Sequence, residues 1–428
     1  MAELNPGDLI DLQSGEHIKV VKELGRGGQG IVYLIEFRGN KYALKWYSRQ
    51  LPESFYKNLK YNVEQGAPND ENQLSLKSFL WPLMLTKQQY DSFGYVMLLR
   101  PDEFKDFGDF ILAKTRFASL SAMITAALKI CQGFHFLHLN GYSYQDLNDG
   151  NFFINPQTGD LLICDNDNVT AQGQNTGILG KARYMAPEIV MGGMPNKYSD
   201  RFSLAVILFL LFYQNHPLEG KRVLSSPCMT EDLDRKHYGS DALFIFDKDN
   251  NQNEPVRGVH NNVIIRWPLF TQTLREIFSE SFSQRQIKNP AERILESKWI
   301  ETVIKLRNCL VICESCKKET FIDLEKASDC VNCGKPLGLK FRIASSKHGI
   351  IALSLGKQVY FGASEQPAAH VLINNKDPQT WLLQNKSSNT WIVETTIGTT
   401  RTVSPNEFMP TKPGLKVTFS QDHKGEII

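Results

Sequence analysis

Three separated groups of residues carry the side chains that phosphoryl transfer requires, and they occur in a suitable order along the chain. The first is the glycine-rich segment 25–30, the second is Lys45, and the third comprises Asp146, Asn151 and Asp165. Glycine turns bring backbone amides close to phosphates, a lysine can hold those phosphates, and carboxylate and amide oxygens are ligands that Mg²⁺ accepts. Together the three groups predict a nucleotide-dependent transfer site.

The glycine segment lies between expected β-strands. Strands are expected at 18–21, 31–37 and 42–46. Gly25, Gly27 and Gly30 would let the turn between the first two strands approach an anion. A glycine-rich hairpin without a ligand is the alternative. Val32, which could cover a purine, and Lys45 on the next strand favour the nucleotide interpretation.

Lys45 ends an apolar strand, where an ammonium group is costly unless it is paired. Glu64 follows 19 residues later, in the segment 54–65 with a helical pattern, and is the predicted partner. Glu53 competes for this role. A third possibility is that Glu64 is a solvated charge on the helix surface.

The segment around Asp146 and Asn151 combines an acid and an amide five residues apart in a loop that enters an apolar strand. The acid can accept a proton from an acceptor hydroxyl, while the amide oxygen can hold Mg²⁺. Asp165 follows the next expected strand, 161–164, and can bind a second face of the metal.

These motifs resemble the eukaryotic-type protein kinase family over residues 16–305. Ala186-Pro187-Glu188, Asp200 and Arg293 fall where that family would place them, and the resemblance implies an ion pair between Glu188 and Arg293. The segment 96–99 looks like the hinge that binds adenine, with Met97 as the gatekeeper. Residues implied in ATP binding are Leu24, Gly25, Gly27, Gly30, Val32, Ala43, Lys45, Met97 and Leu99. Those implied in catalysis are Asp146, Lys45, Glu64, Asn151 and Asp165, of which Asn151 and Asp165 would bind Mg²⁺.

Several positions depart from the family pattern. The usual His-Arg before the catalytic aspartate is Tyr144-Gln145, and the lysine two residues after it is Asn148. Asn166-Asp167 replaces Phe-Gly after the metal aspartate, and Lys181 replaces a threonine. The loss of the arginine predicts activity that does not depend on a phosphorylated loop. A pseudokinase that binds ATP as a scaffold, and a small-molecule phosphotransferase, are the alternatives to an active Ser/Thr protein kinase.

Four of the eight cysteines form two CxxC pairs with 13 residues between them, and their spacing is typical of a zinc ribbon. The predicted Zn²⁺ ligands are Cys313, Cys316, Cys330 and Cys333. Four thiolates leave no open position, so the ion would be structural. A redox dithiol and two buried pairs are the alternatives.

The tail after the cysteine pairs has short alternating strands separated by Gly, Asn, Ser and Pro, which predicts a β-sandwich. Strands are expected at 341–344, 349–353, 358–361, 371–373, 381–384, 391–393 and 417–419. The segment 384–391 is faintly similar to forkhead-associated domains. Gly362-Ala363-Ser364 lacks the arginine that phosphothreonine binding would need, so docking or autoinhibition is the favoured role.

The predicted fold class is therefore α+β: a bilobal kinase fold over 1–307, a zinc ribbon over 308–338 and a forkhead-associated-like β-sandwich over 339–428. Helices are expected at 117–139, 201–213, 270–282 and 296–308.

Composition sets the expected surroundings of the chain. With 48 basic and 46 acidic residues, no global charge favours nucleic acid or membrane surfaces. The N-terminus does not read as a secretory signal, so a cytoplasmic protein is expected.

The long insert at 238–269 and the cysteine pairs resemble a bacterial branch of these kinases. That branch is often encoded beside PP2C-like phosphatases and von Willebrand A-type proteins in tellurium-resistance-like clusters, which implies a protein substrate of the latter type and an opposing phosphatase.

Overall fold

The computed structural model describes residues 3–428 apart from 68–77, 176, 178–179, 227 and 325–327. These residues form two compact units. Unit 1 comprises Met1–Arg116, Lys129–Pro255 and Ser281–Glu296, and unit 2 comprises Phe117–Leu128, Val256–Glu280 and Ser297–Ile428. The expected domain boundaries at 307 and 338 follow sequence motifs rather than this division, and they stay predictions.

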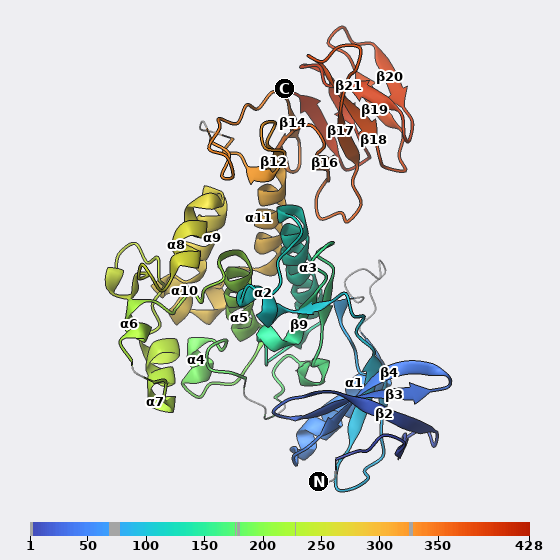
Figure 1. Cartoon of the computed structure of the whole chain (residues 1–428), viewed down its shortest axis with the longest axis vertical. Helices are drawn as coiled ribbons and strands as arrows, with labels where there is room; N and C mark the ends of the chain where they lie inside the picture. Colours follow the sequence, from blue (N-terminus) through green and yellow to red (C-terminus); the bar gives the residue numbers. More distant parts are fainter. Residues whose placement is uncertain (1–2, 68–77, 176, 178–179, 227, 325–327) are drawn as a thin grey trace. The chain divides into compact units, whose positions relative to one another are not determined.

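Unit 1 begins with a six-stranded antiparallel sheet in the order β1-β2-β3-β4-β6-β5. Figure 1 labels β2, β3 and β4 of this sheet. The strands are β1 Leu9–Asp11, β2 His17–Arg26, β3 Gly30–Phe37, β4 Asn40–Tyr47, β5 Met84–Leu85 and β6 Gly94–Leu98. The three strands expected here are confirmed as β2, β3 and β4.

Alternate side chains of this sheet enter two different hydrophobic clusters. Leu44 and Trp46 of β4 belong to one cluster, whereas Tyr47 belongs to the other, together with residues of helix α1 (Glu53–Gln65). Because successive side chains of a strand point to opposite faces, Lys45 lies on the same face as Tyr47. The lysine is thereby directed toward the side of the sheet that α1 covers.

The rest of unit 1 is mainly helical, with short strands beside the loops of the site. Its helices are α2 Phe107–Ile111, α4 Pro187–Val190, α5 Lys197–Tyr213, α6 Lys221–Leu224, α7 Glu231–Asp234 and α10 Gln284–Lys288. Its strands are β7 Lys105–Asp106, β8 Tyr142–Ser143, β9 Phe152–Ile154, β10 Leu161–Ile163 and β11 Thr170–Ala171. Single turns occur at η2 Asp149–Asn151, η3 Asn166–Asn168, η4 Arg235–Ser240, η5 Asn251–Asn253 and η7 Pro290–Glu292.

Helix α5 is the buried helix expected at 201–213. The side chain of Asn196 accepts hydrogen bonds from the amides of Tyr198 and Ser199, and this capping fixes where the helix begins. Every residue from Phe202 to Tyr213 is buried. The first turn, which carries Asp200, is therefore held rigidly in the interior.

Helix α3 (Leu120–Leu139) is the described helix that is long and apolar enough to cross a membrane by length and composition. Of its most apolar window, 61% is buried inside the protein. A core helix has the same pattern.

Unit 2 contains α8 Asn261–Arg266, η6 Trp267–Leu269, α9 Gln272–Ser281 and α11 Glu296–Asn308, followed by the hairpin of β12 Leu310–Ile312 and β13 Glu319–Phe321. The expected helices at 270–282 and 296–308 are thus confirmed as α9 and α11.

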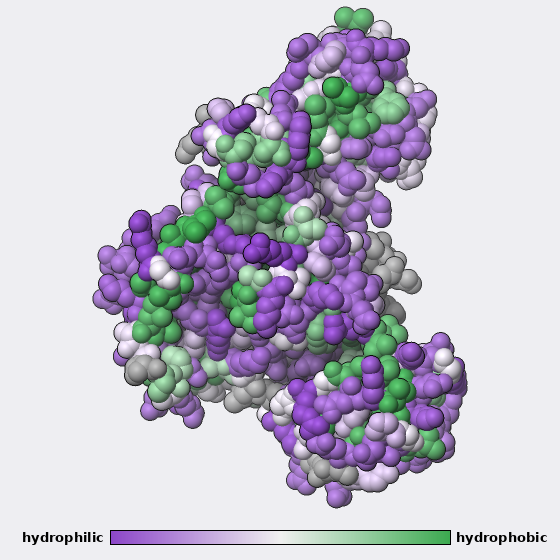
Figure 2. Space-filling view, viewed as in Figure 1, coloured by the Kyte–Doolittle hydropathy of each residue, from purple (hydrophilic) through white to green (hydrophobic). Residues whose placement is uncertain are grey.

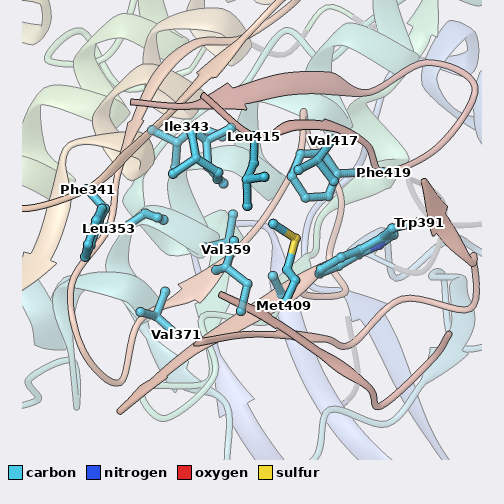
Figure 3. Close-up of a cluster of buried hydrophobic side chains, with 14 of the residues drawn as sticks. Phe341, Ile343, Leu353, Val359, Val371, Trp391, Met409, Leu415, Val417 and Phe419 are labelled. Carbon is cyan, nitrogen blue, oxygen red and sulfur yellow. The ribbon is translucent and has the colours of Figure 1, made fainter. Parts of the chain in front are cut away.

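A β-sandwich completes unit 2. One sheet has the order β15-β14-β23-β22-β19-β20 and the other β16-β17-β18-β21. The strands are β14 Arg342–Ser345, β15 Gly349–Ala352, β16 Gln358–Val359, β17 Ala369–Ile373, β18 Trp381–Asn385, β19 Trp391–Glu394, β20 Thr400–Val403, β21 Phe408–Pro410, β22 Lys416–Thr418 and β23 Lys424–Ile427. Side chains from both sheets, among them Val359, Met409 and Trp391, form its core (Figure 3). The predicted α+β class with a β-sandwich after the cysteine pairs is confirmed, while the likeness of this sandwich to forkhead-associated domains stays a prediction.

The side of the protein drawn in Figure 2 is mainly hydrophilic, with hydrophobic residues in small separate groups.

Candidate active site

The glycines of the turn between β2 and β3 are of two kinds: Gly30 is required by packing, whereas Gly25 and Gly27 face open space. A Cβ atom on Gly30 would lie 2.1 Å from the carbonyl oxygen of Trp46, so only glycine lets β3 lie so close to β4. A Cβ atom on Gly25 would meet nothing within 4 Å, and one on Gly27 would meet only a backbone oxygen at 4.0 Å. The protein's own packing therefore explains Gly30, while it leaves the space beside Gly25 and Gly27 free for a ligand.

Lys45 is buried and contacts three side chains. Its Nζ lies 3.2 Å from Asp165 Oδ1, 2.9 Å from Asp167 Oδ2 and 3.1 Å from Gln29 Oε1 of the glycine turn. Burial alone would lower the pKa of Lys45, but Asp165 and Asp167 raise it instead. The ammonium therefore keeps its charge inside the protein.

Asp167 is the buried partner of Lys45, and the sequence did not single it out for this role. Its side chain is fully buried, and it accepts hydrogen bonds from Tyr47 at 2.6 Å and from Tyr95 at 3.4 Å in addition to Lys45. Two tyrosine hydroxyls and an ammonium satisfy the carboxylate, as a buried charge requires.

The predicted ion pair between Lys45 and Glu64 is wrong. Glu64 is 58% exposed and lies 3.8 Å from Lys60 one helical turn earlier, while the competing candidate Glu53 pairs with Lys57 at 2.7 Å. Both acids lie on the solvent side of α1. The solvated-charge interpretation of Glu64 is the one that the structure confirms.

Helix α1 instead reaches the site through two amides. Asn58 and Asn62 each donate a hydrogen bond of 2.8 Å to the carbonyl oxygen of Val169, just after Asp167. The helix thus holds the backbone of the segment that carries the buried acid.

We expect Asp167→Asn to lower kcat/KM for ATP turnover by about 10- to 100-fold, because a hydrogen bond to a charged group is worth about 1.5–3 kcal/mol. Glu64→Gln, the matched control on α1, should leave the rate unchanged. Steady-state kinetics of both variants, with thermal melting to confirm folding, measures this. A large loss in Glu64→Gln together with wild-type kinetics in Asp167→Asn would contradict the assignment.

The catalytic loop is fixed by Asp200 at the start of α5. The amides of Tyr144 and Gln145 donate to its two carboxylate oxygens at 2.6 and 3.1 Å. Gln145 adopts a positive φ of 71°, and the chain turns there to place Asp146 at the head of the loop.

Asp146 is half-buried and touches Asn148. The Nδ2 atom of Asn148 lies 3.1 Å from Asp146 Oδ1. Burial and the neighbouring Asp165 raise the pKa of Asp146 to about 6, while the hydrogen bond from Asn148 opposes this rise. A carboxylate with a raised pKa is a stronger base than a solvated one, as proton acceptance from a hydroxyl requires.

The two predicted Mg²⁺ ligands lie on neighbouring backbone segments. The amide of Cys164 donates to the carbonyl oxygen of Asn151 at 2.9 Å, and Asp165 follows directly with a positive φ of 58° and a side chain that is 37% exposed. The Oδ1 atom of Asn151 accepts one hydrogen bond, from the amide of Asn148, which leaves a second lone pair. A carboxylate and an amide oxygen fit Mg²⁺, which when bound neutralises phosphate charge.

The residues expected around adenine gather on the α1 side of the sheet. Ala43 and Met97 are buried in the same hydrophobic cluster, and Val32 and Leu99 are packed against it with part of their surface exposed. Leu24, at the end of β2, is 45% exposed. The sheet therefore offers a partly exposed apolar surface near Lys45.

Residues 18–300 match the family model of the protein kinase domain. The chain belongs to the protein kinase family. The kinase is 30% identical over 217 residues to protein kinase C delta type of Mus musculus, covering 48% of this chain and 30% of the relative. It is 26% identical over 220 residues to mitogen-activated protein kinase kinase 2 of Arabidopsis thaliana, covering 49% of this chain and 56% of the relative.

The chain spans less than two thirds of the length of these relatives. Among solved structures, vaccinia related kinase 3 aligns with 16% identity and a TM-score of 0.44, over 56% of this chain and 76% of that one.

The ion pair predicted between Glu188 and Arg293 is also present. Arg293 donates to both carboxylate oxygens of Glu188, at 2.8 and 2.6 Å, and its own side chain is 3% exposed. A bidentate pair of this kind is geometrically specific. It ties α4, which directly follows the activation segment (the residues between Asp165 and Ala186), to the loop that follows η7.

The segment after Asp167 is held by a neutral side chain, at the position where the family usually has an arginine that pairs with a phosphorylated residue. The side chain of Gln145 donates a hydrogen bond of 2.7 Å to the carbonyl oxygen of Gln174. Thr170 is 1% exposed, so its hydroxyl is inaccessible to another kinase. Thr176, the other threonine between Asp165 and Ala186, lies outside the described residues.

The four cysteines of the CxxC pairs come together in unit 2. All four sulfur atoms lie within 4.8 Å of one another, with 3.8 Å between Cys313 and Cys333 and 3.7 Å between Cys316 and Cys330. A tetrahedral zinc ion with Zn–S bonds of about 2.3 Å requires sulfurs about 3.8 Å apart. The thiolate set therefore fits the predicted ion.

Proposed function

We propose that this kinase transfers the γ-phosphoryl group of ATP to serine or threonine hydroxyls of a protein partner or of its own chain, in the cytoplasm. The observation that carries the proposal is the position of Lys45. Its ammonium is buried, charged and within hydrogen-bond distance of Asp165, whose carboxylate remains partly exposed to a metal ion. Asp146, the proposed base, lies close enough for Asp165 to raise its pKa.

A pseudokinase is the second candidate, and the altered loops favour it. Gln145 and Asn148 are neutral where the family usually carries arginine and lysine. Lys45 pairs with Asp167, which follows the metal aspartate, and not with an acid of α1. None of these changes removes the base or the metal ligands, so we favour slow but real turnover.

Binding and transfer together separate the two candidates. We expect Mg-ATP to bind the wild-type protein, and Lys45→Ala or Asp165→Ala to weaken binding or abolish turnover, because each variant removes a charge that faces the phosphates. Calorimetry measures binding, and labelled ATP with Mg²⁺ measures transfer. Wild-type affinity in both variants would refute the site assignment, whereas binding without transfer in the wild-type protein would establish a pseudokinase.

The partner proposals rest on the resemblance of the sequence to a bacterial branch of the family. A von Willebrand A-type protein would be the substrate, and a PP2C-like phosphatase would reverse the reaction. The β-sandwich would serve docking or autoinhibition, and the four cysteines would hold a structural zinc ion.

A further inference from the structure

Lys181 lies beside the catalytic loop, although it belongs to the segment that follows the metal loop. Its Nζ is 3.3 Å from Asp149 Oδ1, and a Cβ atom on Gly150 would lie 4.0 Å from the same Nζ. The preceding residue, Gly180, lies against the base, because a Cβ atom there would be 2.8 Å from Asp146 Oδ1. The backbone that leads into Lys181 therefore lies beside Asp146, and the side chain of Lys181 extends to Asp149 and Gly150.

The reacting end of the site has more negative than positive charge. Lys45 already faces two carboxylates, those of Asp165 and Asp167, and Asp146 adds a third. A transferring phosphoryl group brings further negative charge, which preorganised cations must stabilise. Mg²⁺ on Asn151 and Asp165 would neutralise part of this charge, but Lys45 is already held by two carboxylates, so a second cation near Asp146 can add to the stabilisation.

Lys181 is free to supply that charge. Its side chain is 61% exposed and its partner Asp149 is 27% exposed, and a solvent-exposed ion pair of this kind contributes little. The ammonium can therefore exchange Asp149 for a phosphate oxygen without a large loss.

Asn148 cannot take this role. Its amide nitrogen contacts Asp146 at 3.1 Å, and its oxygen accepts a hydrogen bond from the amide of Gly150 at 3.1 Å. Both ends of the side chain are engaged, and it has no charge.

We propose that Lys181 contacts the γ-phosphoryl group of ATP during transfer and supplies, from the activation segment, the positive charge that the catalytic loop lacks. The inference rests on the proposed function. The acceptor oxygen forms a bond to the γ-phosphorus while the bond from that phosphorus to the bridging oxygen breaks. ADP leaves with the electron pair, the acceptor proton passes to Asp146, and Lys181 forms no covalent bond.

The test is transfer from labelled ATP with Mg²⁺ by the full chain, with the chain itself and casein as acceptors. We expect Lys181→Ala to lower kcat by about 10- to 100-fold, because a charge-assisted contact to the transition state is lost. Lys181→Arg should keep most of the rate. Adding Asn148→Lys to Lys181→Ala should recover part of it, because a lysine there restores an ammonium beside the base.

Lys114→Ala is the matched control, since Lys114 is also an exposed lysine 3.8 Å from an aspartate, Asp109, and should be silent. Wild-type kcat in Lys181→Ala would overturn the proposal. So would a loss that neither arginine nor Asn148→Lys restores, because Lys181 would then act only as a structural partner of Asp149. Absence of transfer by the wild-type protein would defeat the proposed function as well, and so the two failures are distinguishable.

Discussion

Replacing Asp146 by alanine is expected to lower the rate of phosphoryl transfer by about 100- to 10,000-fold, the usual contribution of a positioned base. The geometry supports a large effect, because the backbone around Asp146 is held by Asp200 and its carboxylate contacts Asn148. Incorporation of labelled phosphate by purified wild-type and variant protein measures the loss. Unchanged incorporation in Asp146→Ala would mean that the activity is contamination and would favour the pseudokinase.

The same assay addresses regulation. Thr170→Ala and Thr176→Ala should change the rate little, because Gln145 holds the segment through the carbonyl of Gln174 and cannot form an ion pair with a phosphate. Thr170 is buried, which gives an additional reason for its variant to be silent as a phosphorylation site. Loss of activity in Thr176→Ala alone would show that a phosphorylation switch exists.

The parts of the site that lie close together in sequence were predictable. Alternation along β4 places Lys45 opposite Leu44 and Trp46, so a buried amine on one face of the sheet follows from the pattern alone. The arrangement of Asp146, Asn151 and Asp165 follows from short loops around β9 and β10. Short connections leave few ways to separate such residues.

The partner of Lys45 was harder to predict because it comes from 122 residues away. The helical pattern of this segment argues against Glu64 as the partner, since Phe55, Leu59 and Asn62 are the buried residues of α1. Glu64 lies two residues beyond Asn62, about 200° around the helix, which places it on the solvent side. Asp165 and Asp167, which flank Asn166, both follow the buried strand β10. Their position was the sequence signal that an acid other than Glu64 could pair with Lys45.

The β-sandwich was predictable as an architecture but not strand by strand. Strands β20, β21 and β23 were missed because each has one buried residue, which is Val403, Met409 and Ile427 respectively. Edge and polar strands are defined by pairing with their neighbours rather than by their own alternation.

Removing zinc is expected to unfold residues 308–338, because thiolate ligation in a module of this size supplies about 10 kcal/mol. The hydrophobic cluster beside the cysteines is small: its three buried side chains are Val311 and Ile322 of this stretch and Ala352 of β15, against eighteen in the sandwich core. Elemental analysis should find one zinc per chain. Cys330→Ser should lose it, whereas Cys228→Ser, a change of an exposed cysteine outside the cluster, should retain it.

The two halves of the cluster give this prediction its physical basis. Each CxxC pair is followed by a residue with positive φ, Lys317 at 59° and Gly334 at 68°, whose amide donates to the carbonyl of the first cysteine of its pair. Burial alone would raise the pKa of Cys330, but amide hydrogen bonds from Asn332 and Cys333 lower it to about 6, so its thiolate is available to a metal at neutral pH. Two such turns hold the sulfurs at the spacing of a tetrahedral ion. A protein that is metal-free as purified, with Cys313 and Cys330 readily alkylated and the hairpin of β12 and β13 intact, would show that these thiols are free and that the small cluster folds without an ion.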